Sequence, residues 1–245
     1  MPRGTGRALS RDVPPTVPRP LPHPLLPLRL RPAAAVLLAA CAGVALVLGI
    51  LFAGQTHAGR LDASVDGWIR SGLAHDQALL RLLAWLGDLG PVTVMTAALV
   101  LACAVARRWR GCVLAAVAVP AASALTEFVF KPLTDRTLNG WLSYPSGHAT
   151  VMFALASVSW MLLANPAGQR LPGAVRLMVA FGAFLLALAV SVAMVGLGFH
   201  YFTDIAGGAA VGAGTVLVCA FVVEWAAASR RRHPREQTGR LRLGR

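Results

Sequence analysis

Long apolar stretches alternate with short polar turns along this chain of 245 residues. A helix needs about 20 mostly apolar residues to cross the hydrocarbon core of a bilayer. Six stretches approach or exceed that length, and the first contains no charged residue. They cover residues 33–54, 91–106, 112–130, 148–164, 177–198 and 205–228. The pattern predicts an all-α fold, a polytopic membrane helical bundle of about six transmembrane helices.

The segments outside these stretches differ in composition. Residues 55–90 are polar but carry tryptophans and leucines at intervals, which predicts an additional helix lying along the membrane interface. Residues 1–32 are rich in proline and arginine without a helical period, which predicts a disordered basic cytoplasmic tail. Residues 230–245 form a second basic cytoplasmic tail. The membrane-embedded domain is therefore expected to extend over residues 33–229.

The charge composition also favours a membrane protein. Only 13% of the residues are charged, against about 25% in soluble domains. The net charge of +13 would be compatible with nucleic acid, but the arginines gather in the two tails and in short turns. That distribution is typical of cytoplasmic loops. The predicted partners are the membrane and a lipid, not nucleic acid, and the composition leaves the oligomeric state open.

The arginine-rich turns set the expected orientation. With six spans, the arginines after the second and the sixth span and those of the first tail fall on one side: Arg3, Arg7, Arg11, Arg19, Arg29, Arg31, Arg107, Arg108, Arg110, Arg230, Arg231 and Arg232. Positively charged loops stay in the cytoplasm. The chain is predicted to be a multi-pass cell-membrane protein with both termini cytoplasmic.

Three polar clusters fall together on the opposite, outer side. They comprise residues 131–136, 144–148 and 200–204, each at the outer end of a span. The first begins with Lys131, the only lysine of the chain. Because the orientation was assigned from arginines elsewhere, the shared location of the clusters independently indicates a single site.

The first two clusters carry groups suited to binding a phosphate. Ser146 precedes an apolar span and is a candidate N-cap, so the N–H groups of Gly147 and His148 would face outward with the positive end of the helix dipole. Lys131 and Arg136 add positive charge. His148 can also act as a general acid near neutral pH.

The third cluster suits nucleophilic attack. His200 and Asp204 are four residues apart, which places them on one face of a helix. A carboxylate that holds one imidazole nitrogen leaves the other free to attack. Two histidines beside cations suit phosphoryl transfer through a phosphohistidine, with no metal and no cofactor. A metal site made of His148, His200 and Asp204 is the alternative, but the nearby cations would repel a metal ion.

Pro145-Ser146-Gly147-His148 followed by His200-x-x-x-Asp204 resembles the type-2 phosphatidic acid phosphatase family, over about residues 60–225. Its members include bacterial lipid phosphatases and undecaprenyl-diphosphate phosphatases. The resemblance implies that His200 is the nucleophile, that Asp204 supports it and that His148 protonates the leaving group. It further implies that phosphate is bound by Lys131, Ser146 and Gly147.

Two motifs depart from the family pattern. Leu138 and Asn139 stand where the first motif usually has Arg-Pro, and Ala193 and Met194 stand where the third usually has Ser-Arg. Arg136, two residues before the first of these positions, is the expected substitute. The phosphate site is therefore predicted to be less cationic than usual.

Taken with the site, the resemblance implies a metal-independent phosphoric monoester or diphosphate hydrolase acting at the extracytoplasmic face. Polyprenyl diphosphate, phosphatidylglycerol phosphate and phosphatidic acid all fit as substrates. One alternative is a catalytically weak or inactive relative that binds lipid phosphates or acts as a membrane scaffold. Another is a transporter that flips the lipid, although few charges lie within the spans.

Glu127 is expected to pair with Lys131 or Arg136 and to position its partner.

Overall fold

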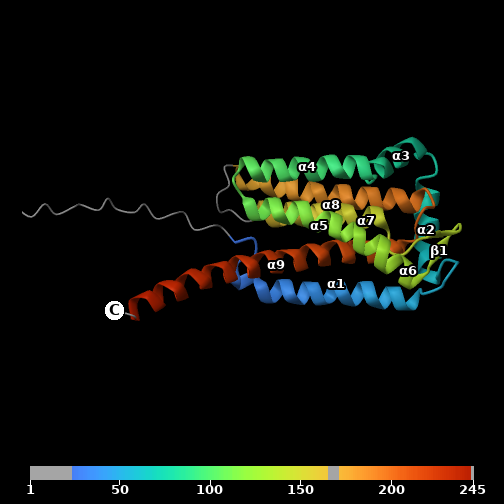
Figure 1. Cartoon of the computed structure of the whole chain (residues 1–245). Coiled ribbons are helices and arrows are strands. Elements are labelled where there is room, and N and C mark those ends of the chain that lie inside the picture. Colours follow the sequence, from blue (N-terminus) through green and yellow to red (C-terminus); the bar gives the residue numbers. More distant parts are fainter. Residues whose placement is uncertain (1–23, 165–170, 244–245) are drawn as a thin grey trace, which may run out of the picture.

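The protein is an all-α bundle, described here from a computed structural model over residues 24–164 and 171–243 (Figure 1). Residues 1–23 and 244–245, which belong to the two predicted tails, lie outside this range. The α-helices are α1 (Arg31–Leu51), α2 (Arg60–Gly72), α3 (Gln77–Leu86), α4 (Leu89–Val105), α5 (Trp109–Leu125), α6 (Lys131–Thr134), α7 (Gly147–Ala164), α8 (Gly173–Gly196) and α9 (Phe202–Leu243). A short turn η1 (Leu28–Leu30) precedes α1.

The connection between α5 and α7 has its own structure. A π-helical turn, η2 (Thr126–Phe130), joins α5 to α6, so the predicted third span continues as far as Thr134. Two short strands, β1 (Thr137–Leu138) and β2 (Trp141–Leu142), then form an antiparallel hairpin at one end of the bundle. Insertion of a π turn shifts the helical register, and such turns are frequent at functional sites.

Four or five of the described helical stretches are candidate spans by length and composition, and a shorter apolar helix lies at the remaining predicted position. Four helical stretches are long and apolar enough to cross a membrane: Leu28–Leu51, Trp109–Thr134, Gly173–Gly196 and Phe202–Ser229. The α3–α4 pair, bent by 51°, makes a fifth if it is counted as one span. The predicted span at 148–164 is a shorter apolar helix. It packs within the bundle against α5, α8 and α9.

Small residues bring α7 and α9 close together. Ala149 and Ala154 of α7 are fully buried. Gly208 of α9 faces the start of α7, and a Cβ atom on it would lie 2.5 Å from the carbonyl oxygen of Ser146. Glycine is required here because no larger residue would fit between the two backbones. This close approach brings residues 146–148 beside the first turn of α9.

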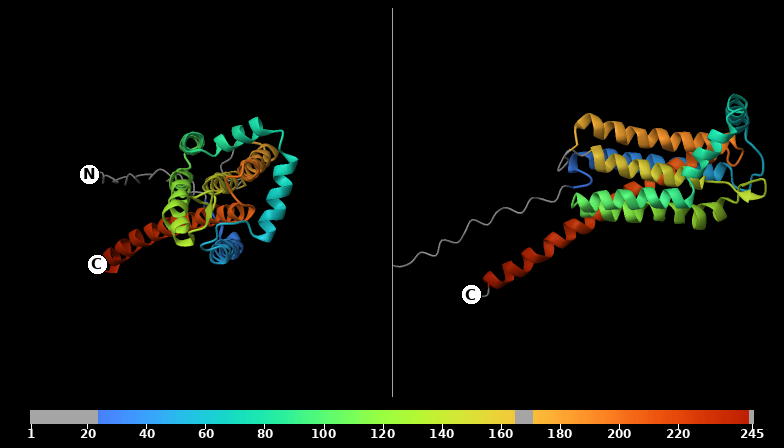
Figure 2. Two further views of the ribbon diagram at one scale, coloured as in Figure 1. Left: turned by 90° about the vertical axis from the view of Figure 1, so that its right-hand side faces the viewer. Right: turned by 90° about the horizontal axis from the view of Figure 1, so that it is seen from above.

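The predicted interfacial helix is two helices. Within residues 55–90, α2 and α3 cover the end of the bundle that also carries the β-hairpin (Figures 1 and 2). One face of α2 is buried and contains Asp62, Asp66 and Ile69, while Trp68 is 77% exposed. We call this end of the bundle the site end. Two buried carboxylates on one helix face require hydrogen-bonding or charged partners. Those partners lie in the candidate active site.

The opposite end is held by an ion cluster around Glu224 of α9. Its carboxylate accepts a hydrogen bond from the Leu25 backbone N–H at 2.7 Å and pairs with Arg110 at 3.1 Å and Arg31 at 3.7 Å. Leu26 is buried with Ala34 and Leu217. Residues 25 and 26, assigned to the N-terminal tail from composition, thus pack against the bundle.

Candidate active site

Backbone N–H groups at the start of α9 are bound by the two carboxylates of α2. Asp66 Oδ1 accepts from the Phe202 N–H at 3.0 Å, and Asp62 Oδ1 accepts from the Thr203 N–H at 2.9 Å. The first N–H groups of a helix have no partner within the helix, and negative charge there is stabilised by the helix dipole. These bonds fix α2 to the turn that carries the predicted nucleophile.

Arg136 lies beneath this turn and is fully buried. Its guanidinium donates to Asp62 Oδ2 and Asp204 Oδ1, each at 2.6 Å, and to Thr203 Oγ1 at 2.7 Å. The rings of Phe52 and Tyr201 lie on it, with centroids 4.2 and 4.3 Å away. Arg136 therefore contacts Asp62, Thr203 and Asp204 in the structure. The sequence had predicted that it contacts the phosphate.

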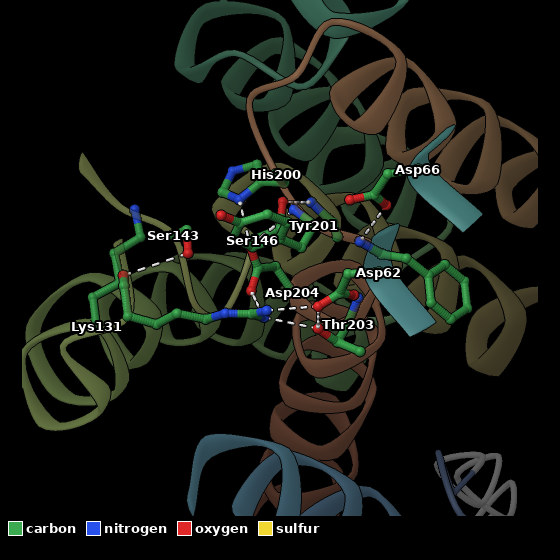
Figure 3. Close-up of polar contacts among 12 residues, drawn as sticks. Asp62, Asp66, Lys131, Ser143, Ser146, His200, Tyr201, Thr203 and Asp204 are labelled. Atoms are coloured by element: carbon green, nitrogen blue, oxygen red, sulfur yellow. Dashed lines mark hydrogen bonds and ion pairs between the residues drawn. The ribbon is translucent and has the colours of Figure 1, made fainter. Parts of the chain in front are cut away.

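Asp204 and His200 come together as their spacing suggested. Asp204 Oδ2 accepts from the Tyr201 N–H at 3.0 Å and lies 3.6 Å from His200 Nδ1 (Figure 3). The bond to Tyr201 is the reciprocal half of a capping box, in which the third helical residue reaches back to the cap. The buried Nδ1 atom has no hydrogen-bond partner among the described residues. The carboxylate is thus fixed where a small ring rotation would complete the pair.

Ser146 joins the start of α7 to the start of α9. Its N–H donates to the Asp204 carbonyl oxygen at 3.0 Å, and its Oγ accepts from the Ala149 N–H at 3.4 Å. The hydroxyl therefore caps α7, as expected of a serine in this position. Since Ser146 is fully buried, it acts on the site through the backbone that it orients.

Lys131 is paired with Glu127, which was expected to pair with either Lys131 or Arg136. The Nζ atom lies 2.7 and 2.9 Å from the two carboxylate oxygens. Glu127 also lies against the first turn of α7, because a Cβ atom on Gly147 would be 2.9 Å from Oε1. The carboxylate thus stands before the helix N-terminus, the position that favours an anion.

His148 has an acidic partner of its own. Its Nε2 atom lies 3.1 Å from Asp88 Oδ1, at the start of α4. A carboxylate on one ring nitrogen orients the imidazole and fixes which nitrogen faces the cavity. Asp88 is thus positioned to assist a proton donor.

A cavity of about 630 Å³ opens between these groups. Lys131, Gly147, His148 and His200 line it, whereas Arg136, Ser146 and Asp204 lie behind its wall. Leu138 and Met194 also line it. Among the described residues of the wall, Lys131 is the only lysine or arginine. The wall residues are Glu127, Lys131, Leu138, Asn139, Trp141, Leu142, Gly147, His148, Met194, Gly198, Phe199 and His200.

A second, mostly apolar groove of about 860 Å³ runs between α4 and α5. It begins beside Asp88 and continues past Val92, Val100 and Ala104. Glu127, Gly147 and His148 line both this groove and the polar cavity. Polar and apolar spaces therefore meet at a shared wall, as an amphipathic ligand would require.

Sequence reasoning missed the roles of three aspartates, Asp62, Asp66 and Asp88. The spacing of Asp62 and Asp66 by four residues was a usable signal, because it puts both on one helix face. Burial raises the pKa of Asp66 to about 6, and the neighbouring charges of Asp62 and Asp204 act in the same direction. The contact between Asp88 and His148 has no local signal, since it joins residues 60 positions apart.

Comparison with known protein families supports the motif assignment. The family model described as PAP2 superfamily matches residues 122–228, a segment from the end of α5 through most of α9. The match includes every residue predicted for the site and agrees with the resemblance drawn from the motifs. No curated protein and no solved structure matches the chain.

Proposed function

We propose that the protein belongs to the PAP2 superfamily, a family of phosphatases whose model matches residues 122–228, and that it hydrolyses lipid phosphates through a phosphohistidine intermediate. One observation carries the proposal: His200, His148, Lys131 and Gly147 line a single cavity that continues into an apolar groove. A nucleophile, a proton donor and a place for a hydrocarbon chain are thus adjacent.

In the first step His200 attacks the phosphorus through the nitrogen that does not face Asp204. A nitrogen–phosphorus bond forms, and the bond from phosphorus to the leaving oxygen breaks. His148 gives that oxygen its proton, and the alcohol departs. Lys131 and the N–H groups at the start of α7 stabilise the negative charge on the phosphoryl oxygens.

In the second step water replaces His200 on the phosphorus. His148, now neutral, takes a proton from the water as its oxygen attacks, and inorganic phosphate and free His200 result. Asp204 keeps the ring of His200 in one tautomer and one orientation through both steps. Arg136 fixes Asp204 in turn and acts as a positioning residue.

The intermediate gives the direct test. A substrate carrying ³²P in the transferred phosphoryl group is mixed with purified protein and quenched, and we expect an acid-labile, alkali-stable phosphoenzyme. His200→Ala should abolish both the label and phosphate release. His57→Ala, on an exposed histidine outside the cavity, is the matched control and should retain both. Turnover by His200→Ala near the parent rate would refute the mechanism.

A lipid-phosphate binder without turnover is the second candidate. It is favoured by Leu138 and Met194, which line the cavity where the family pattern has arginines, and by the engagement of Lys131 with Glu127. Saturable binding of a lipid phosphate without phosphate release, unchanged in His200→Ala, would support this function over hydrolysis.

We also infer that the site faces the outside of the cell. The α4–α5 turn, with Arg107, Arg108 and Arg110, lies at the end of the bundle opposite the site (Figure 1), and such turns stay in the cytoplasm. A cysteine at exposed Ala74, between α2 and α3, should react with a membrane-impermeant maleimide in intact cells. Labelling only after lysis would reverse the orientation, and the parent chain controls for its four cysteines.

A further inference from the structure

The wall shared by the polar cavity and the apolar groove determines what leaving group the site can accept. Glu127, Gly147 and His148 belong to both spaces. A lipid phosphate with its phosphorus at His200 and its chain in the α4–α5 groove must place its leaving oxygen at this wall. The charge of the wall therefore acts on the leaving group directly.

That wall is acidic. Glu127 stands before the start of α7, with Oε1 2.9 Å from the position of a Cβ on Gly147. Asp88 lines the groove side and is bound to His148. Lys131 is the only lysine or arginine among the described residues that line either space. The junction thus combines two carboxylates, one ammonium group and one imidazole.

Two arginines near the cavity are bound to partners outside the junction. Arg70, whose guanidinium carbon is 3.9 Å from the position of a Cβ on Gly198, donates to the Val195 carbonyl oxygen and pairs with Asp66. Arg136 is fully buried and bound to Asp62 and Asp204. Leu138 and Met194 are uncharged. Lys131, which is paired with Glu127 at 2.7 Å, is the one cation of the described walls that can approach the transferred phosphoryl group, and no second lysine or arginine there remains for another phosphate.

We propose, building on the function proposed above, that the site is selective for lipid phosphate monoesters over lipid diphosphates, with Glu127 as the specificity-determining residue. In a monoester the bond from phosphorus to the alcohol oxygen breaks, and His148 protonates that oxygen to give an uncharged alcohol. The carboxylates of the wall can then accept hydrogen bonds from the alcohol or from hydroxyls near it.

A diphosphate places a second phosphate at the same wall. Its leaving group is a lipid monophosphate that stays negatively charged after His148 has protonated its bridging oxygen. Like charges brought together in a partly desolvated site repel strongly. Glu127 would therefore disfavour both binding of the diphosphate and development of charge on its leaving group, and removal of this carboxylate should relax the selectivity.

A matched substrate pair isolates this effect. Farnesyl monophosphate and farnesyl diphosphate have the same hydrocarbon chain and differ only in the second phosphate. With the purified full-length protein in detergent, we expect kcat/KM to be at least tenfold higher for the monophosphate. In Glu127→Gln, the diphosphate-to-monophosphate ratio of kcat/KM should rise about tenfold, and Glu127→Lys should raise it further.

The control variant is Asp76→Asn. It removes one negative charge from an exposed position before α3, outside both the cavity and the groove, and the ratio should not change. A wild-type protein that prefers the diphosphate, or a ratio unaffected in both Glu127 variants, would overturn the selectivity while leaving the phosphatase function in place. Absence of phosphate release from both substrates and from phosphatidic acid would instead refute the proposed function, and the selectivity with it.

Discussion

Arg136 joins carboxylates from two elements through one guanidinium group. It contacts Asp62 of α2 and Asp204 of α9 at 2.6 Å each, between two aromatic rings. Replacing a whole buried charge network of this kind by well-packed apolar residues changes the free energy of unfolding little. Removing one member is strongly destabilising, because it leaves the other charges buried and unpaired. The contacts are those of a residue that stabilises the site, and in the proposed mechanism Arg136 acts on the reaction through Asp204.

Arg136→Ala should consequently act on stability before substrate binding. Removing the guanidinium leaves two buried carboxylates uncompensated, which costs about 3–5 kcal/mol. We expect a marked drop in the melting temperature in detergent. Lys131→Ala should leave the melting temperature nearly unchanged and lower kcat/KM by tenfold or more, corresponding to about 1.4 kcal/mol. If Arg136→Ala kept the melting temperature of the wild type and only raised KM, the result would instead support direct binding of phosphate by Arg136.

At the scale of elements, two contacts fix the start of α9. The carboxylates of α2 bind its N–H groups, and the start of α7 packs against Gly208 and bonds to Asp204 through the Ser146 N–H. The proposed nucleophile, His200, is thus positioned by neighbouring helices rather than by its own loop. Substitutions at either contact should therefore alter the position of His200 without changing a residue of the cavity wall.

Asp66 should make the α2–α9 contact sensitive to pH. The pKa of this carboxyl is about 6 in the folded protein and 3.8 as its ordinary value. Because the folded state binds the proton more tightly, the stability contribution of protonated Asp66 is fully present below about pH 4 and is lost as pH rises through about 6. Melting temperatures measured between pH 4 and 7 should fall less steeply with rising pH in Asp66→Asn than in the wild type. Identical slopes would contradict the raised pKa.

Gly208→Ala should separate α7 from α9. The added Cβ would lie 2.5 Å from a backbone oxygen that cannot turn away, and such overpacking typically costs about 1–3 kcal/mol. We expect turnover to fall by roughly tenfold, since the Ser146–Asp204 bond would lengthen. Gly182→Ala is the matched control, because a Cβ there meets nothing within 4 Å. Equal activity of both variants would show that the close approach is dispensable.

Across the whole molecule, the two ends of the bundle carry different chemistry. The site end holds the cavity, α2, α3 and the β-hairpin, and the opposite end holds the Glu224 cluster (Figures 1 and 2). Large apolar side chains such as Val36, Leu101 and Phe181 are exposed along the bundle between them. In lipid such exposure is favourable, because the surroundings are apolar too.

Hydrolysis should proceed without a metal ion. Lys131 and the N-terminus of α7 supply the positive charge that a metal would otherwise provide. Among the side chains that the structure describes, in residues 24–163 and 171–229, no group of three His, Cys, Asp or Glu is placed to hold one. Phosphate release should therefore be unchanged in EDTA. Loss of activity in EDTA that magnesium or zinc restores would contradict the proposed mechanism.

The sequence by itself determined the all-α membrane class and the residues of the motifs. Apolar length can be read locally, because a span must be long enough to cross a bilayer of fixed thickness. The spacing of His200 and Asp204 was also informative, although His200 precedes α9, so the turn before the helix brings the two side chains together. The π turn after α5 and the 51° bend between α3 and α4 carry no such local signal.

Only the tertiary structure decided which charges are available to a phosphate. Arg136 and Lys131 look equivalent in the sequence, but packing buries the first between Asp62 and Asp204 and leaves the second in the cavity wall. A buried cation must find its partners wherever the fold brings them. Here they come from α2 and α9, 74 and 68 positions away along the chain, which no local pattern encodes.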